Sequence, residues 1–510
     1  MIAYHDTRGL IDRPRTFTEA ILEGIAPGGG LFVPERLPRF PVDETVALAA
    51  LPYHERAARV YEAFELDVEA TRTREIAAAA YAGNFDDPAV APVREVAPGR
   101  FVLELWHGPT LAFKDMALQC MPLYFSQALE QAHASGATKL DFLILVATSG
   151  DTGVAALNGF ADRASTRIVV YYPDAGVSAL QELQMVTQPG DNLSVFRLDG
   201  DFDDCQNSVK AVFDDAGFAE ELAGRHGLAL SSANSINWGR LMPQIVYYMS
   251  AYADMAAGGH LEPGGPLDVC VPTGNFGNIL AAHYAKLMGV PLGRLLCASN
   301  SNNVLADFIA TGVYDISARR LVKTPSPSMD ILISSNLERL LYHLCEDPAV
   351  IAGWMKSLRE AGRFSVDEAT RDRLQAELTG AWVDNDTCLA TIGDVYREHG
   401  YLLDPHTAVA WKVAAELGGE GPPVLIASTA HWSKFAADVV RGLRGIPAAA
   451  PIPGETDELA LLDRVVELAP GASIPPQLAA VRSRPRRFDA RVAAGREAVE
   501  TSLRGWLAGA

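Results

Sequence analysis

The chain has 510 residues, of which 49% are hydrophobic and 21% charged, a composition typical of a globular protein of about two to four domains. Its formal net charge of −20 argues against nucleic acid and anionic membranes as partners, because both repel an acidic surface. The start lacks the apolar core of a secretory signal, no apolar run reaches the ~18 residues that cross a bilayer, and the cysteines form no C-x-x-C pair. These features predict a soluble cytoplasmic protein.

Helical segments alternate with turns over the first hundred residues, and residues 92–110 read as strands with a turn at Pro98-Gly99. Apolar residues then recur at helical spacing over 114–134. Strand-like apolar runs follow at 140–148, 166–173, 267–273 and 423–429, with helical segments between them. This alternation predicts an α/β fold whose parallel sheets are covered on both faces.

The stretch "HGPTLAFKDMALQ" (107–119) places Lys114 near the start of the predicted helix, among mostly apolar residues. One interpretation is structural: the side chain reaches water and pairs with Asp115. The other is chemical: an amine desolvated in a pocket is neutral at working pH and forms an imine with a carbonyl. The stretch by itself leaves both open.

Two strand-to-helix turns are suited to binding anions. In "VPTGNFGNILAAH" the glycines at 274 and 277 let the backbone approach a ligand, and the amides up to Asn278 would point outward at a helix N-terminus. In "ATSGDTGVAA" the residues Ser149, Asp151 and Thr152 begin another helix. The alternatives are a tight turn in the first case and ordinary helix capping in the second. Ligands of open α/β sheets bind at the carboxyl ends of the strands, where both turns lie.

Two further stretches carry polar side chains. "SSANSINWGRL" offers Asn234, Ser235 and Arg240, which suit a phosphate or carboxylate clamp or form a polar turn with a surface arginine. "STAHWSKF" ends a strand with Thr429 and its neighbouring serine. The histidines have no metal-ligand spacing, so no metal site is expected.

With these stretches in view, the chain resembles the threonine synthase family, which belongs to the fold-type-II (tryptophan synthase β-like) enzymes that use pyridoxal 5′-phosphate (PLP). The resemblance covers almost the whole chain. It rests on "YHDTRG", "FTEAILEGIAPGGGLFVPE", "HGPTLAFKD", "TSGDTG", "NSINWGR", "PTGNFGN", "PSPSMDILISSNLERLL", "DPHTAVA" and "STAHWSKF".

The resemblance implies two parallel-sheet α/β domains and an N-terminal domain over 1–100. The large PLP-binding domain would comprise 101–135 and 236–510, with 451–510 as a helical extension. The small mobile domain would comprise 136–235.

It also implies a role for each candidate residue. Lys114 would form the imine with PLP, and Thr429 would face the pyridine nitrogen. The cofactor phosphate would lie against Gly274, Asn275, Phe276, Gly277 and Asn278. Ser149, Asp151 and Thr152 would hold the substrate carboxylate, and Asn234, Ser235 and Arg240 the substrate phosphate. Trp432 and Ser433 replace the more usual Pro-Ala, so His431 and Lys434 are left outside the expected site.

The implied reaction converts O-phospho-L-homoserine and water to L-threonine and phosphate, by γ-elimination and addition of water at Cβ. The alternatives are a threonine-synthase-like phospholyase, an amino-acid dehydratase of the same fold, or a non-catalytic relative that binds a ligand or partner. The expected partner is the small-molecule substrate, and the sequence leaves both a monomer and a homodimer open.

Overall fold

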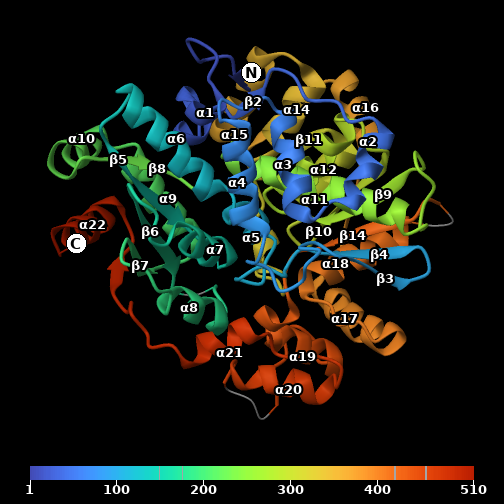
Figure 1. The fold of residues 1–510 in the computed structure, drawn as a ribbon. Coiled ribbons are helices and arrows are strands. Elements are labelled where there is room, and N and C mark those ends of the chain that lie inside the picture. Colours follow the sequence, from blue (N-terminus) through green and yellow to red (C-terminus); the bar gives the residue numbers. More distant parts are fainter. Residues whose placement is uncertain (149, 175, 419–420, 454–456, 510) are drawn as a thin grey trace.

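Two sheets organise the chain in the computed structural model, which describes all residues except 149, 175, 419–420, 454–456 and 510 (Figure 1). The larger sheet has the order β13-β10-β9-β14-β4-β3 and is parallel except for the β3–β4 pair. Its strands are β3 (Val93–Ala97), β4 (Arg100–Glu104), β9 (Leu267–Pro272), β10 (Leu292–Ser299), β13 (Leu378–Trp382) and β14 (Val424–Ser428).

The smaller sheet has the order β15-β7-β6-β5-β8, and all its pairs are parallel. Its strands are β5 (Asp141–Ala147), β6 (Thr166–Pro173), β7 (Leu193–Asp199), β8 (Leu228–Ser231) and β15 (Arg491–Ala493). The other strand pairs are β1 (Tyr4–Asp6) with β2 (Phe32–Pro34) and β11 (Val313–Asp315) with β12 (Arg363–Ser365).

Alternate residues of each central strand enter different cores, as expected for strands buried on both faces. In β9, Val269 and Val271 join one core and Cys270 joins the other. In β5, Ile144 and Leu145 divide in the same way. The predicted α/β fold with parallel sheets covered on both faces is therefore confirmed.

The covering helices are split between the two faces of each sheet. One core of the large sheet includes α11 (Trp238–Ala257) and α12 (Gly277–Leu287), and the other includes α17 (Asn385–His399), α18 (Pro405–Leu417), α19 (Ala436–Arg444) and α20 (Ala460–Leu468). The small sheet lies between α6 (Met121–Ser135), α7 (Asp151–Phe160) and α8 (Ala179–Val186) on one face and α9 (Phe202–Phe213) and α22 (Arg496–Gly509) on the other. The remaining helices include α5 (Lys114–Leu118), α10 (Ala216–Glu221), α13 (Val304–Thr311), α14 (Leu337–Cys345), α15 (Pro348–Ala361), α16 (Glu368–Glu377) and α21 (Pro476–Ser483).

The N-terminal part shares its core with the large sheet. Its helices are α1 (Phe17–Glu23), α2 (Val42–Ala47), α3 (Tyr53–Ala63) and α4 (Ala70–Tyr81). Residues of α1, α3 and α4 pack in the same core as those of α11. The expected boundary after residue 100 is wrong, because it would cut β4 after its first residue and separate β3 from the rest of β4, its partner in the large sheet. The N-terminal part ends before Val93.

The C-terminal end also differs from expectation. Helix α20 packs in a core of the large sheet, as a 451–510 extension of the large domain would. However, β15 pairs with residues 197–199 of β7, and α22 contributes Val499, Leu503 and Leu507 to a small-sheet core. Figure 1 shows this red segment running from α20 past α21 to the small sheet. The assignment of 491–509 to the large domain is wrong, because a three-residue strand gains its place through a distant partner that no local pattern reveals.

Leu503→Ala tests the attachment of α22. Leu503 is fully buried against the small sheet, so we expect the free energy of unfolding in urea to fall by about 2–5 kcal/mol, the usual cost of such a cavity. Thr501→Ala, at an exposed position on the same helix, should change it by less than about 0.5 kcal/mol. Equal effects of the two substitutions would show that α22 is not docked.

No helix in the described ranges combines the length and the apolar character needed to span a membrane.

Candidate active site

Lys114 is the first residue of the short helix α5 and is buried, with a side chain that is 10% exposed. Its Nζ lies 3.3 Å from Asp151 Oδ2 and 3.4 Å from Ser328 Oγ. Asp115 does not pair with it: that carboxylate accepts hydrogen bonds from the backbone N–H (2.8 Å) and hydroxyl (2.7 Å) of Thr110. The surface ion pair between Lys114 and Asp115 is therefore ruled out, and the amine lies in a closed polar site.

Asp151 begins α7 and is shared between two lysines. Its Oδ1 lies 2.8 Å from Lys434 Nζ and accepts a hydrogen bond from Gln181 Nε2 at 2.8 Å, while Oδ2 faces Lys114. Lys434 is fully buried, and its Nζ also donates to the carbonyl of Thr110 at 2.8 Å. One buried carboxylate thus joins segments of the large and small domains.

Burial and charge set the protonation of this group. Burial lowers the pKa of Lys114, and the nearby Lys434 ammonium lowers it further, although the Asp151 carboxylate acts in the opposite direction. Burial alone would raise the pKa of Asp151, but the ammonium groups of Lys434 and Lys114 outweigh it and hold this pKa below its ordinary range. Asp151 is therefore ionised, and Lys114 loses its proton more readily than an exposed lysine.

The glycine-containing turn lies between β9 and α12. Its carbonyls are fixed by a neighbouring segment: Gly274 O accepts from Ser334 Oγ at 2.6 Å, and Asn275 O accepts from Asn336 Nδ2 at 3.0 Å. The first N–H groups of α12, from Gly277 and Asn278, have no intrahelical acceptor. Phe276 has φ 64°, which turns the chain into the helix. The turn therefore presents amides at the positive end of a helix.

Gly274 and Asn278 have different reasons to be in this turn. A Cβ on Gly274 would lie 2.8 Å from the carbonyl oxygen of Ser328, so close packing is enough to require glycine at this position. Asn278 is different: its Oδ1 accepts from the hydroxyls of Tyr247 and Tyr248 at 2.7 and 2.5 Å, and its Nδ2 is buried with no partner in the described part of the chain. An unpaired buried donor beside a helix N-terminus indicates an anionic ligand.

Thr429 lies directly after β14 and is 5% exposed. Its carbonyl accepts a hydrogen bond from Phe113 N–H at 2.8 Å, which fixes the end of β14 beside Lys114. Neighbouring Ser428 accepts from Trp106 Nε1 at 3.0 Å. Because β14 is parallel to both β4 and β9, the carboxyl ends of these three strands lie at the same edge of the sheet.

The expected substrate-binding residues are only partly brought together. Ser149 lies outside the described residues, whereas Thr152 follows Asp151 in α7. Arg240 is buried in α11; one of its Nη atoms donates to Ala233 O at 2.6 Å, and its Nε has no partner in the described chain.

Asn234 and Ser235 do not form a clamp with Arg240 in this structure. Asn234 is exposed, and Ser235 contributes a carbonyl that accepts from Asn336 Nδ2 at 3.2 Å. Within the described residues no hydrogen bond joins either side chain to Arg240. Burial lowers the pKa of Arg240 to about 10, so the guanidinium stays charged at neutral pH.

Sequence reasoning missed several residues that complete the site. Ser328 donates through its hydroxyl toward Asp151 (3.4 Å), and its backbone N–H donates to His406 Nε2 at 3.1 Å. His406 Nδ1 lies 2.7 Å from Asp404. Ser328 and His406 belong to "SPSMD" and "DPHTAVA", so these two motifs carried the available signal. Lys434 of "STAHWSKF", left outside the expected site, contacts Asp151.

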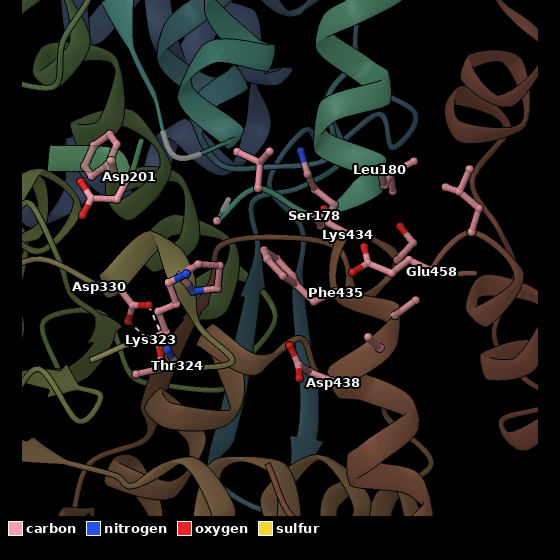
Figure 2. Close-up of a pocket in the computed structure, with 18 of the residues that line it drawn as sticks. Ser178, Leu180, Asp201, Lys323, Thr324, Asp330, Lys434, Phe435, Asp438 and Glu458 are labelled. Carbon is pink, nitrogen blue, oxygen red and sulfur yellow. Dashed lines mark hydrogen bonds between the residues drawn. The ribbon is translucent and has the colours of Figure 1, made fainter. Parts of the chain in front are cut away.

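A pocket of about 370 Å³ opens beside this group (Figure 2). Figure 2 shows Ser178, Leu180, Lys323, Phe435 and Glu458 around it. Its described lining includes Lys434 but neither Lys114 nor the turn at 274–278, so the pocket adjoins the Lys114–Asp151–Lys434 group through Lys434 and does not surround it.

His107, from the same motif as Lys114, is held between two carboxylates. Its Nδ1 lies 2.6 Å from Asp86 and its Nε2 lies 3.0 Å from Glu104, and only a doubly protonated ring can donate to both. Burial lowers its pKa, but the hydrogen bonds to Glu104 and Asp86 outweigh this and raise the pKa above its ordinary value. The ring also stacks on Trp106, with centroids 4.2 Å apart.

This geometry predicts a pH-dependent contribution to stability. Because the folded-state pKa is raised, the contribution of His107 is complete below about pH 6.5 and is lost as pH rises through the folded pKa. His107→Gln should lower the free energy of unfolding by about 1–3 kcal/mol at low pH and by less at high pH. Urea unfolding measured from below about pH 6.5 to above the raised folded-state pKa checks this prediction, with His54→Gln as control. A difference in unfolding free energy between wild type and His107→Gln that stays constant with pH would contradict it.

Comparisons with known proteins identify the family. A model of the threonine synthase N terminus matches residues 3–81, and a model of pyridoxal-phosphate-dependent enzymes matches 98–428. Threonine synthase of Pseudomonas aeruginosa is 38% identical over 459 residues, covering 89% of this chain and 93% of that protein. The chain belongs to the threonine synthase family.

Structures and further relatives agree with this family. The PLP-bound threonine synthase from Brucella melitensis has a TM-score of 0.85 and 34% identity, with 99% of both chains covered. The human protein threonine synthase-like 1 is 44% identical over 437 residues, but the chain spans only 58% of its length. The cofactor of this threonine synthase family member is pyridoxal 5′-phosphate.

The described residues fit this cofactor. A buried lysine with a lowered pKa suits an aldehyde carbon. The N-terminal turn of α12 suits a phosphate, because Asn278 Nδ2 has no partner among the described residues there. Arg240 Nε is also buried with no partner among the residues that the structure describes, which makes its guanidinium a further buried positive group near this site.

Proposed function

We propose that the protein is a threonine synthase, which converts O-phospho-L-homoserine and water to L-threonine and phosphate in the cytoplasm. The observation that carries the proposal is the buried Lys114–Asp151 pair in a chain that covers 93% of the Pseudomonas threonine synthase. Lys114 would hold the cofactor covalently. Gly274, Asn275, Phe276, Gly277 and Asn278 would bind its phosphate, and Thr429 would face its ring nitrogen.

Bound pyridoxal phosphate supplies an electron sink that stabilises a carbanion next to the substrate amine. Lys114 Nζ, neutral once its proton is lost, would take the proton from Cα and return protons later in the reaction. The N-terminus of α7, with Asp151, Thr152 and Ser149, would orient the substrate carboxylate. Arg240, with Asn234 and Ser235, would hold the phosphate that leaves from Cγ, and water would add at Cβ.

Closure of the small domain is part of the proposal, because water must be excluded early and admitted late. The ion pairs support it, because Asp151 of the small domain contacts Lys114 and Lys434 of the large domain and so can hold the two domains together. Asn234, which is exposed, would approach the phosphate only when substrate binds.

A second candidate is a threonine-synthase-like phospholyase, which would release phosphate without forming threonine. The reason to test it is that human threonine synthase-like 1 is 44% identical to the chain and the Pseudomonas threonine synthase 38%, so similarity to proteins named threonine synthase does not by itself fix the reaction. An amino-acid dehydratase of the same fold has no such observation in its support.

The deciding experiment incubates the PLP-loaded protein with O-phospho-L-homoserine and quantifies threonine, phosphate and 2-oxobutyrate together. Equal amounts of threonine and phosphate, with little oxoacid, are the expected result. Phosphate with oxoacid and no threonine would instead establish the phospholyase. A protein with bound cofactor that releases no phosphate would overturn both.

A further inference from the structure

Lys434 has no role in the reaction as described so far, yet it is the most buried cation of the site. Its Nζ makes two short contacts, to Asp151 Oδ1 and to the carbonyl of Thr110, both at 2.8 Å. The Asp151 contact to Lys114 is longer, at 3.3 Å. The carboxylate is therefore held by Lys434 more tightly than by Lys114.

This difference matters for the chemistry of Lys114. An isolated buried carboxylate next to an amine favours the ammonium form, which is not a nucleophile. A carboxylate already paired with another cation exerts a much smaller net field on the amine. Asp151 is also fixed by Gln181 Nε2, so it cannot turn fully toward Lys114.

We propose that Lys434 is a positioning residue, which neutralises Asp151 and thereby leaves the Lys114 amine free to bind the cofactor. The inference rests on the proposed role of Lys114. It assigns no contact with substrate to Lys434. It also gives a reason why the lysine in the short helical segment after β14 is fully buried, since burying a charge without such a partner costs stability.

The charged and titratable groups around the pair come from several elements. Lys114 and Asp115 lie on α5, Asp151 on α7 and Arg240 on α11, and His431 lies next to Lys434 in the segment after β14. Burial lowers the pKa of His431 to about 3, so its ring is neutral. Asp115 is held by Thr110, so within the described part of the chain Asp151 is the anion in contact with Lys114.

The test measures the dissociation constant of pyridoxal phosphate from the full-length protein between about pH 6 and pH 10, using the absorbance of the bound cofactor. Wild type is compared with Lys434→Met, Lys434→Arg and the double variant Asp151→Asn/Lys434→Met. The midpoint of the affinity–pH curve reports the pH at which a proton on the Lys114 amine competes with binding of the cofactor.

Lys434→Met should move the midpoint upward by about one pH unit, because Asp151 is then left to Lys114 alone. Lys434→Arg, which keeps the charge, should stay near wild type. The double variant should return to within about half a unit of wild type, since it removes both members of the pair.

Affinity lowered equally at every pH, with an unchanged midpoint, would show a merely structural role and overturn the proposal. A double variant with a midpoint more than about one unit below wild type would also overturn it, and this comparison holds even where Lys434→Met fails to fold. Failure of the Lys114 assignment is distinguishable, because Lys114→Ala would then retain a borohydride-reducible cofactor.

Discussion

Replacing Lys114 by alanine is expected to lower the rate of phosphate release from O-phospho-L-homoserine by more than about 10³-fold. The variant loses both the proposed covalent attachment of the cofactor and the group that moves the Cα proton. Borohydride reduction followed by peptide mass analysis should find the cofactor on Lys114 in the wild type and on no residue in the variant.

The matched control is Lys356→Ala, at an exposed lysine of α15, which should retain wild-type turnover. Thermal unfolding of both variants separates loss of chemistry from loss of structure. Turnover by Lys114→Ala near the wild-type rate would refute the assignment of Lys114.

Asp151→Asn should destabilise the protein strongly. Its carboxylate is buried between Lys114 and Lys434, and removing one partner of a buried ion pair usually costs about 3–5 kcal/mol. Because the folded-state pKa of Asp151 is lowered, its contribution is present above about pH 4 and is lost as pH falls through the folded pKa. The difference in unfolding free energy should therefore be largest near neutral pH.

Urea unfolding at several pH values measures this effect, with Asp489→Asn at an exposed aspartate as control. The control should change stability by less than about 0.5 kcal/mol. An Asp151→Asn protein as stable as wild type at neutral pH would show that the two lysines do not depend on the carboxylate. Turnover should fall in the same variant, since Asp151 lies at the reactive amine.

The sequence by itself determined the alternation of strands and helices, because apolar periodicity is a local property that burial imposes on every strand. It also indicated the turn at 274–278 and the segment of Lys114, since glycines and a lysine among apolar residues stand out without knowledge of their neighbours. The family followed from the order of its motifs, and the comparisons confirmed that family and its cofactor.

Only the tertiary structure decided which charges meet. Nothing local pairs Lys114 with Asp151, 37 positions away, in preference to its neighbour Asp115, and Lys434 reaches the same carboxylate from the far end of the chain. The placement of β15 beside β7 and the boundary before β3 have the same origin. Sheet pairing and buried ion pairs join residues that are distant in sequence, and their energies depend on burial. Apolar periodicity predicts which face of an element is buried, but it does not predict which other element covers that face.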